Sequence, residues 1–245
     1  MYSAIIKYDY LDFLNIFKSK ECFTDHLLIQ SGVIQTLKFN GNNYVLFATA
    51  SDLLANNEQD PKPQSDNSIF GKILLIDSEK NYSFFSRGFR NILGLYADDD
   101  IIISTENGPK GGDEINKVVY NKNYGWPISS YGQKYKNNNL DYKLSHEKYG
   151  FEEPIFSWVP SIGVSQIVKI ENNFTPFWED NFLIGSLNFK HLIRVKFNNS
   201  YDKLIFKENI FINERIRDLK YSKKHKLILL SLEDTGSLGV LYIKD

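Results

Sequence analysis

The sequence predicts an all-β protein built from repeated units, and three observations lead to this fold class. The first is that short apolar runs dominate the chain, for example NYVLFATA, GKILLID, DIIISTE, DNFLIGSL and KLILLSL. The second is that turn-forming Asn, Asp and Gly separate these runs, as at Asn40-Gly41 and Asn198-Asn199. The runs have the length of strands, and no window of about a dozen residues keeps the period of an amphipathic helix.

The third observation is that the runs recur in larger units. One unit begins at Gly71 with GKILLID and ends in IIISTENG, and a later unit begins near His191 with HLIRVKF and ends in KLILLSLEDTG. Each unit spans roughly 40 to 50 residues and contains four strands, which is the period of a propeller blade. We therefore predict a single, incomplete β-propeller domain over residues 1–245, with about four to five blades.

Two further features concern the outline of this domain. The polar stretch around 131–150 has few apolar residues, so we predict that it is a surface insert rather than a linker. The last run, GSLGVLYIKD, begins a unit that is not finished. Because propellers close by pairing strands from their two ends, we expect a partner or a missing segment to complete the ring.

Composition and charge exclude several classes of protein. The net charge is −1, so nothing indicates a nucleic-acid or anionic-membrane surface. No stretch approaches the roughly 18 apolar residues that a membrane span requires. The start, MYSAIIKYDYLDF, lacks the basic and apolar regions of a signal peptide. Cys22 is the single cysteine, so an internal disulfide is impossible and the compartment is left open.

Arginine is scarce, and its positions are clustered. Lysine and arginine together number 29. The arginines are Arg87, Arg90, Arg194, Arg215 and Arg217, and four of these lie in two tight pairs. A guanidinium group is a planar fork that binds a carboxylate with two hydrogen bonds, whereas lysine is a point charge. The pairs indicate places where a carboxylate is held, and clustering by chance is the competing interpretation.

The segment Thr105–Pro127 is the densest in chemically useful residues. Its first part, TENGPKGGDE, places Glu106, Asp113 and Glu114 around several glycines. Glycines allow backbone carbonyls to turn toward one point, and Ca²⁺ binds carbonyl oxygens together with carboxylates. The competing interpretation is an acidic turn between strands with a structural role. The spacing is not that of an EF-hand loop.

This segment resembles the signature of the glucose/sorbosone dehydrogenase family, E-x-G-P-x-G-G-D-E-[IL]-N followed by N-Y-G-W-P. Other stretches are similar to the family in the same order along nearly the whole chain, namely SIFGKILLID, SRGFRNILGL, EEPIFSWVPSIGVSQIV, NFLIGSLNFKHLIRVKF and ERIRDLKYSKKHKLILLSLEDTG. The resemblance implies a propeller of the six-bladed sugar dehydrogenase type. It also implies pyrroloquinoline quinone (PQQ) and Ca²⁺ in the central mouth.

The resemblance further implies a role for individual residues. Those that would contact PQQ are Arg90, Asn91, Ser161, Arg215 and Arg217. The backbone carbonyls of Gly108 and Pro109 would hold the Ca²⁺. Arginine suits this cofactor because PQQ carries three carboxylates. The chain departs from the family at Leu93, where glutamine is frequent, and at Asn188, where lysine is common and Lys190 lies nearby.

The activity implied by the resemblance is oxidation of the C1 hydroxyl of an aldose to a lactone, with electrons passed to PQQ. The family's general base is a histidine in an H-x-G-x-R-[IL] element. The corresponding stretch here is QSGVIQTLKF, in which Gly32 falls where that histidine is expected and Thr36 where the arginine is expected. His26, a few residues upstream, is the nearest candidate for the catalytic base.

Three alternatives therefore stay open beside the dehydrogenase. The chain could be a catalytically inactive propeller that binds a ligand or partner, a gene fragment, or a calcium-dependent propeller of the lactonase type. The expected partner is a small sugar, with no nucleic acid and no membrane span. Family members are periplasmic or secreted, and we expect a cytoplasmic location only if the chain is complete, since it shows no signal peptide.

Overall fold

The computed structural model describes residues 2–7, 10–21, 32–51, 56–57, 60–134 and 142–244. In these ranges the regular secondary structure is almost entirely β-strand. The helical segments are single 3-10 turns: η1 (Lys62–Gln64), η2 (Glu147–Tyr149) and η3 (Pro176–Trp178). Across the described ranges, no helix has the length and apolar character needed to cross a membrane.

Among the described residues, three antiparallel sheets contain four strands each, and we call them blades 1 to 3. Blade 1 consists of β3 (Gly32–Phe39), β4 (Asn42–Thr49), β7 (Lys72–Ile76) and β8 (Tyr82–Arg87). Blade 2 consists of β9 (Ile92–Ala97), β10 (Ile102–Glu106), β11 (Asp113–Lys117) and β12 (Phe156–Trp158). Blade 3 consists of β13 (Val164–Lys169), β14 (Asn181–Ser186), β15 (His191–Phe197) and β16 (Leu204–Phe211).

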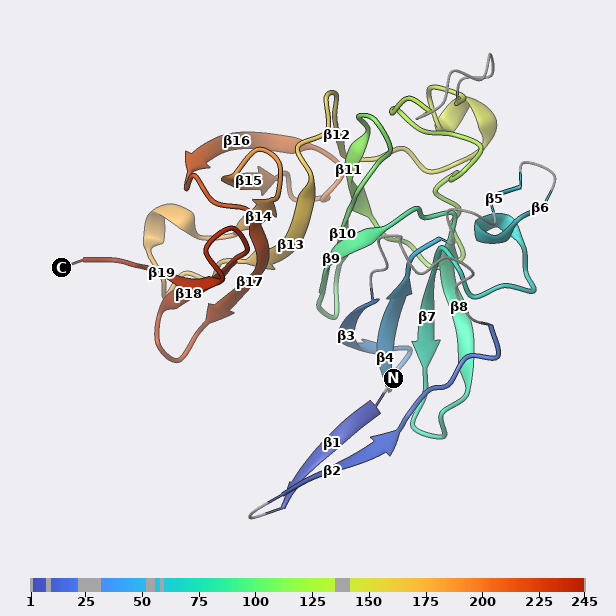
Figure 1. Cartoon of the computed structure of the whole chain (residues 1–245), viewed down its shortest axis with the longest axis horizontal. Coiled ribbons are helices and arrows are strands. Elements are labelled where there is room, and N and C mark those ends of the chain that lie inside the picture. Colours follow the sequence, from blue (N-terminus) through green and yellow to red (C-terminus); the bar gives the residue numbers. More distant parts are fainter. Residues whose placement is uncertain are drawn as a thin grey trace.

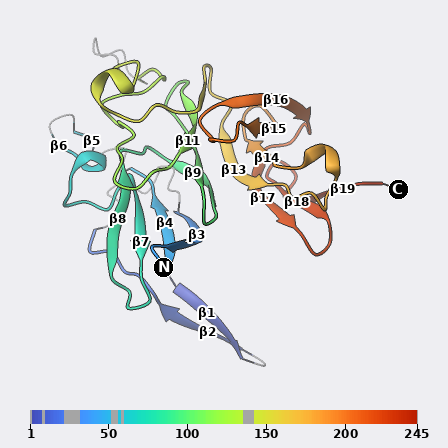
Figure 2. The same cartoon turned by 180° about the vertical axis from the view of Figure 1, so that it is seen from behind.

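A fourth sheet, blade 4, has three strands. They are β17 (Ile216–Ser222), β18 (Leu227–Leu232) and β19 (Ser237–Tyr242). Two small sheets lie outside the blades. One is the hairpin of β1 (Tyr2–Lys7) and β2 (Tyr10–Asn15), which projects away from the body of the protein (Figures 1 and 2), and the other joins β5 (Asn56–Asn57) to β6 (Asp60–Pro61).

The blades are arranged in an arc around their first strands. Strands β3, β9, β13 and β17 contact one another in succession, and they lie toward the middle of the molecule in Figure 1 while the other strands lie outward. This radial order of four-stranded sheets is a β-propeller. The prediction of an all-β fold built as a β-propeller is therefore confirmed.

The hydrophobic core lies between successive blades. Blades 1 and 2 bury Leu46, Ile73, Ile92 and Leu95 between them, blades 2 and 3 bury a second cluster that includes Phe182, and blades 3 and 4 bury a third. Strand side chains alternate between the two faces of a sheet, so each inner blade needs apolar residues on both faces. Burying one such side chain completely contributes about 1.5–3 kcal/mol.

The sequence repeat has the period of the blades but a different phase. The unit that begins at Gly71 comprises β7 to β10, and these strands divide between blades 1 and 2. The unit from His191 likewise comprises β15 to β18 and divides between blades 3 and 4. Apolar runs mark where strands lie, but the hydrogen bonds between strands decide where each sheet starts.

Candidate functional site

One end of the blades collects nearly all of the predicted site residues. Each of blades 2 to 4 begins with its inner strand, so the segments 88–91, 161–163 and 213–215, which lead into β9, β13 and β17, lie on the same face of the propeller. Their neighbours run antiparallel, so the segments that follow β10, β14 and β18 return to that face. We call this face, with its segments 88–91, 107–112, 161–163, 187–190, 213–215 and 233–234, the mouth face.

The strands carry β-bulges near the mouth face, and these bulges change the direction of nearby side chains. The pairing register shifts at Thr105/Glu106 in blade 2, between Val164 and Ile167 in blade 3, and between Ile216 and Asp218 in blade 4. Such bulges bend a strand and turn the extra residue out of the ladder, and they are common beside active sites. In blade 4 the residue inside the bulge is Arg217.

Arg90 is a deeply enclosed cation on this face. It is 4% exposed, its Nη1 donates to the carbonyl of Asn107 at 2.8 Å, and its guanidinium lies 5.6 Å from the ring of Trp126. It forms no ion pair with any described residue, and its buried Nε has no hydrogen-bond partner there. The adjacent Asn91 is equally buried, and both polar atoms of its amide lack partners among the described residues.

One glutamate of blade 2 holds this arginine segment, and a second lies beside the first. The carboxylate of Glu106 accepts a hydrogen bond from the backbone N–H of Arg90. Glu114 lies opposite Glu106 in the pairing of β10 with β11. Burial and the Glu114 carboxylate raise the pKa of Glu106 to about 8, against the opposing effect of the Arg90 hydrogen bond and charge.

A buried histidine extends this group into the polar insert. His146 is 2% exposed, its Nδ1 lies 3.0 Å from the carbonyl of Tyr124, and its Nε2 lies 3.5 Å from Glu114 Oε1. Burial disfavours the charged imidazole, but the Glu114 carboxylate, together with Glu153 and the Tyr124 carbonyl, outweighs that cost and raises the pKa of His146. The sequence reasoning assigned no role to His146, because no motif surrounds it.

Asp113 holds the other side of blade 2. Its carboxylate is fully buried, and its Oδ1 accepts hydrogen bonds from the Gly108 N–H at 3.0 Å and the Ser161 hydroxyl at 2.7 Å. Its Oδ2 accepts from the backbone N–H groups of residues 162–164, at 3.0, 2.7 and 3.2 Å. The three carboxylates of the acidic turn therefore bind neighbouring loops of the protein itself.

The carbonyl oxygens of Gly108 and Pro109 have no such role. Neither accepts a hydrogen bond from any described residue. The turn is held by the polar insert, because the backbones of Lys110 and Gln133 exchange hydrogen bonds at 3.2 and 2.8 Å. Within the described residues there is no cluster of three or more His, Cys, Asp or Glu side chains that could hold a metal ion, so a cation at this turn would depend on carbonyl oxygens.

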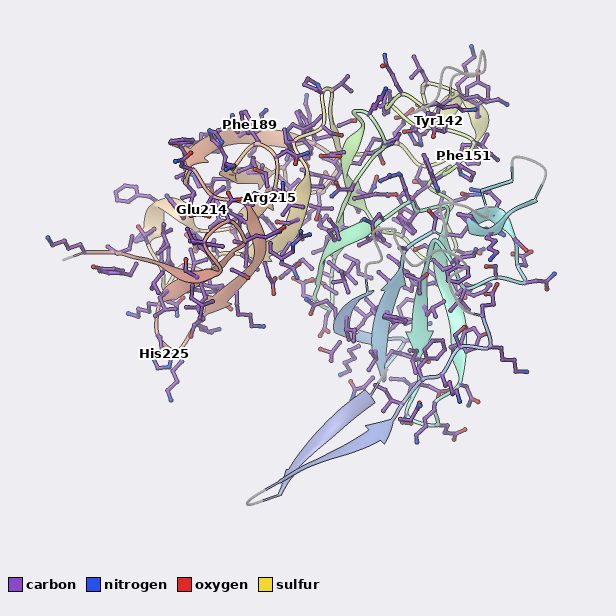
Figure 3. All side chains as sticks on the ribbon, in the orientation of Figure 1. Tyr142, Phe151, Phe189, Glu214, Arg215 and His225 are labelled. Atoms are coloured by element: carbon purple, nitrogen blue, oxygen red, sulfur yellow. The ribbon has the colours of Figure 1, made fainter. Side chains whose placement is uncertain are left out.

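The second arginine pair lies at blade 4 and is partly neutralised. Arg217 Nη2 lies 2.5 Å from Glu233 Oε2, whereas Arg215 Nε lies 3.5 Å from Oε1 of the same carboxylate. Arg215 Nη1 also donates to Asn188 Oδ1 at 3.1 Å. Figure 3 labels Glu214 and Arg215, which precede β17, and His225, which lies in the turn between β17 and β18 at the opposite end of blade 4.

Lys190 lies near the position where the family has a lysine, and here it forms an ion pair with Asp234. Its ammonium group lies 2.7 Å from Asp234 Oδ2, and this ion pair lowers the pKa of Asp234. Ser161 is also constrained, because its hydroxyl proton already goes to Asp113. A ligand at Ser161 would therefore meet an accepting oxygen rather than a donor.

The expected catalytic base, His26, lies outside the described residues. Gly32 begins β3 on the mouth face, and a side chain there would approach the Phe47 ring to 3.3 Å. His191 lies at the same end of blade 3, on the third strand, where its ring stacks on Phe189 with centroids 4.1 Å apart.

Comparison with known proteins gives a consistent picture. The family model described as Glucose / Sorbosone dehydrogenase matches residues 18–240. The aldose sugar dehydrogenase YliI of Escherichia coli (strain K12) is 29% identical in an alignment of 220 residues that covers 82% of this chain and 57% of that protein. The chain thus spans little more than half the length of this curated relative.

Solved structures show the same fold. A glucose dehydrogenase crystal structure is 26% identical, with a TM-score of 0.72, over 86% of this chain and 63% of that one. The apo form of the soluble aldose sugar dehydrogenase from Escherichia coli aligns with a TM-score of 0.78 at 23% identity, over 95% and 69%. The PQQ-bound aldose sugar dehydrogenase from Streptomyces coelicolor aligns with a TM-score of 0.60 at 18% identity, over 80% and 57%.

Proposed function

The chain belongs to the glucose/sorbosone dehydrogenase family, and from this premise we propose that it binds PQQ and Ca²⁺ at the mouth face and oxidises the C1 hydroxyl of an aldose to the lactone. The observation that carries the proposal is Arg90, a buried guanidinium without a carboxylate partner among the described residues. Burying an unpaired charge is costly, so the protein gains when an anionic ligand reaches it.

The residues present fit such a ligand. Arg90 and Arg215 supply guanidinium donors, and the amide of Asn91 supplies both a donor and an acceptor without partners in the described part of the chain. Arg217 could join them by exchanging Glu233 for a ligand carboxylate. The carbonyl oxygens of Gly108 and Pro109 provide the kind of oxygen that Ca²⁺ binds.

The chemistry divides between cofactor and protein. When bound, the quinone supplies the two-electron acceptor that oxidation of an alcohol requires. The protein must bind and orient both molecules, and a side chain must take the proton of the C1 hydroxyl. His26 is our candidate for that base.

The test is a titration of the purified protein with PQQ, with and without Ca²⁺, followed by dye reduction with a panel of aldoses. We expect binding that depends on Ca²⁺ and on Arg90, and turnover that is lost in His26→Ala. Absence of PQQ binding by folded protein would overturn the proposal.

Gly32 favours a second candidate function. It begins the inner strand of blade 1, at the position where the family histidine is expected, and it offers no proton acceptor. A catalytically inactive propeller that still binds the anionic ligand would account for both Gly32 and Arg90. Tight PQQ binding without turnover of any aldose would establish this alternative.

A further inference from the structure

Asp113 joins two segments of the mouth face that belong to different blades. The Gly108–Pro109 turn follows β10 in blade 2, whereas Ser161 precedes β13 in blade 3. The Gly108 N–H and the Ser161 hydroxyl donate to the same carboxylate oxygen, Asp113 Oδ1. A shift of either group therefore changes the hydrogen bond that the other group makes.

The link is stiff because the carboxylate has no freedom to follow one segment alone. Asp113 is fully buried and forms no ion pair with a described residue, so its charge is stabilised by the donors around it. Its second oxygen is fixed by the consecutive N–H groups of residues 162–164. Other contacts across this boundary, from Thr105 to Ser165 and from Asn107 to Val164, involve neither Gly108 nor Ser161.

We propose that Asp113 is a positioning residue that couples the two halves of the mouth face, so that a cation on the Gly108 and Pro109 carbonyls and a quinone at Ser161 each strengthen the binding of the other. The inference rests on the proposed function and adds an energetic link through one side chain. Ordering the turn around a cation fixes Gly108, and through Asp113 it also fixes Ser161. Thermodynamic linkage requires the converse effect to be equal.

The experiment measures this coupling as a ratio of affinities. Ca²⁺ is titrated with and without saturating PQQ, and PQQ with and without Ca²⁺, by calorimetry. For the wild type we expect each ligand to tighten the other about tenfold, and for Asp113→Asn we expect a factor below about twofold. The asparagine amide retains a single accepting oxygen and presents N–H groups to donors, so it cannot hold both segments.

Two further variants separate coupling from loss of folding. Ser161→Ala removes the hydroxyl link and leaves the backbone bonds of residues 162–164, so it tests the coupling even if Asp113→Asn does not fold, and it should give an intermediate factor. Asp98→Asn is the matched control. Asp98 also accepts backbone N–H groups, from Asp100 at 3.0 Å and Ile101 at 2.9 Å, but it lies in the β9–β10 turn at the opposite end of blade 2.

The outcomes distinguish the inference from the function on which it rests. A wild-type coupling factor in Asp113→Asn or Ser161→Ala would overturn the role of Asp113, and so would an equal loss in Asp98→Asn. Wild-type protein that binds PQQ with no effect of Ca²⁺ would overturn the coupling and leave quinone binding standing. Failure to bind PQQ at all would overturn the proposed function and this inference together.

Discussion

At the scale of single residues, the charges of the mouth face divide into two groups. The acidic side chains are occupied, since Glu106 holds the Arg90 backbone and Asp113 holds the loop at Ser161. The groups that stay available are Arg90 and the carbonyls of Gly108 and Pro109. The acidic turn therefore serves as structural support, and the donors and acceptors without partners are the groups on which the proposed anionic ligand and its cation depend.

Replacing Arg90 by lysine tests the importance of the guanidinium fork. We expect Arg90→Lys to weaken PQQ binding about tenfold, since lysine keeps the charge but loses the paired donors and the contact with Trp126. Arg87→Lys is the matched control, because Arg87 lies on the outer strand β8 and pairs with Asp66 at 2.5 Å. Equal dissociation constants for Arg90→Lys and the wild type, measured by calorimetry, would contradict this prediction.

Two buried groups, the Glu106 carboxyl and the His146 imidazole, should make the stability of the protein depend on pH. The pKa of Glu106 in the folded protein is raised to about 8 and that of His146 is also raised, so the folded state binds protons more tightly than the unfolded chain. The free energy of unfolding should therefore fall as pH rises from about 5 to 8. Denaturant titrations at several pH values across this range measure the free energy of unfolding.

Glu106→Gln isolates the contribution of one side chain. Glutamine keeps an oxygen for the Arg90 N–H but does not ionise, so the fall of stability with pH should become shallower. Glu79→Gln, in the exposed turn after β7, serves as the control and should leave the slope unchanged. Parallel curves for wild type and Glu106→Gln would show that this carboxyl does not carry the effect.

At the scale of elements, the inner strands of neighbouring blades approach very closely. Gly94 on β9 makes this approach possible, because a Cβ there would lie 2.6 Å from the backbone N of Ile167 and 2.8 Å from the carbonyl of Ser165 on β13. The same boundary carries the hydrogen bond from Thr105 Oγ1 to the Ser165 carbonyl, at 2.6 Å. Glycine here is required by packing between blades.

Gly94→Ala should accordingly destabilise the protein by about 3 kcal/mol, since the clash is with backbone atoms that cannot move independently. Gly239→Ala in β19 is the comparison. Its Cβ would meet only side-chain atoms of Leu232 and Leu230, at 3.1 and 3.3 Å, so a loss of about 1 kcal/mol is expected. Similar unfolding midpoints for the two variants in denaturant would refute the argument.

The limits of sequence reasoning also appear at the scale of elements. Apolar periodicity predicted the strands and the blade period, and the motifs indicated Arg90, Asp113 and Arg215. The phase of the blades was not predictable, because it depends on which strands exchange hydrogen bonds. For the same reason, no local pattern could assign Asp113 to the loop at Ser161, which lies 48 residues further along the chain, or pair Glu114 with His146.

At the scale of the whole molecule, the two ends of the arc differ. The outer face of blade 1 is covered by Phe17, whose ring lies 5.8 Å from that of Phe47 and 5.4 Å from that of Tyr82. Blade 4 has no such cover within the described chain. Its last strand exposes 74% of Leu238, 51% of Val240 and 65% of Tyr242, and no described strand pairs with its outer edge.

An uncovered apolar sheet face with a free edge promotes association. We therefore expect the chain to self-associate as its concentration rises, and Val240→Lys to shift it toward the monomer. Val240 lies opposite Leu229 in the register of β18 and β19, so a lysine there places a charge in the middle of the exposed face.

Val119→Lys is the matched control for this last prediction, because Val119 is a partly exposed valine in the loop after β11, away from blade 4. Sedimentation velocity at several concentrations should show a smaller mean mass for Val240→Lys than for wild type and Val119→Lys. Equal association of all three proteins would mean that blade 4 is not the contact. If the wild type is a monomer at every concentration, the exposed apolar face of blade 4 does not drive association, and the prediction is wrong.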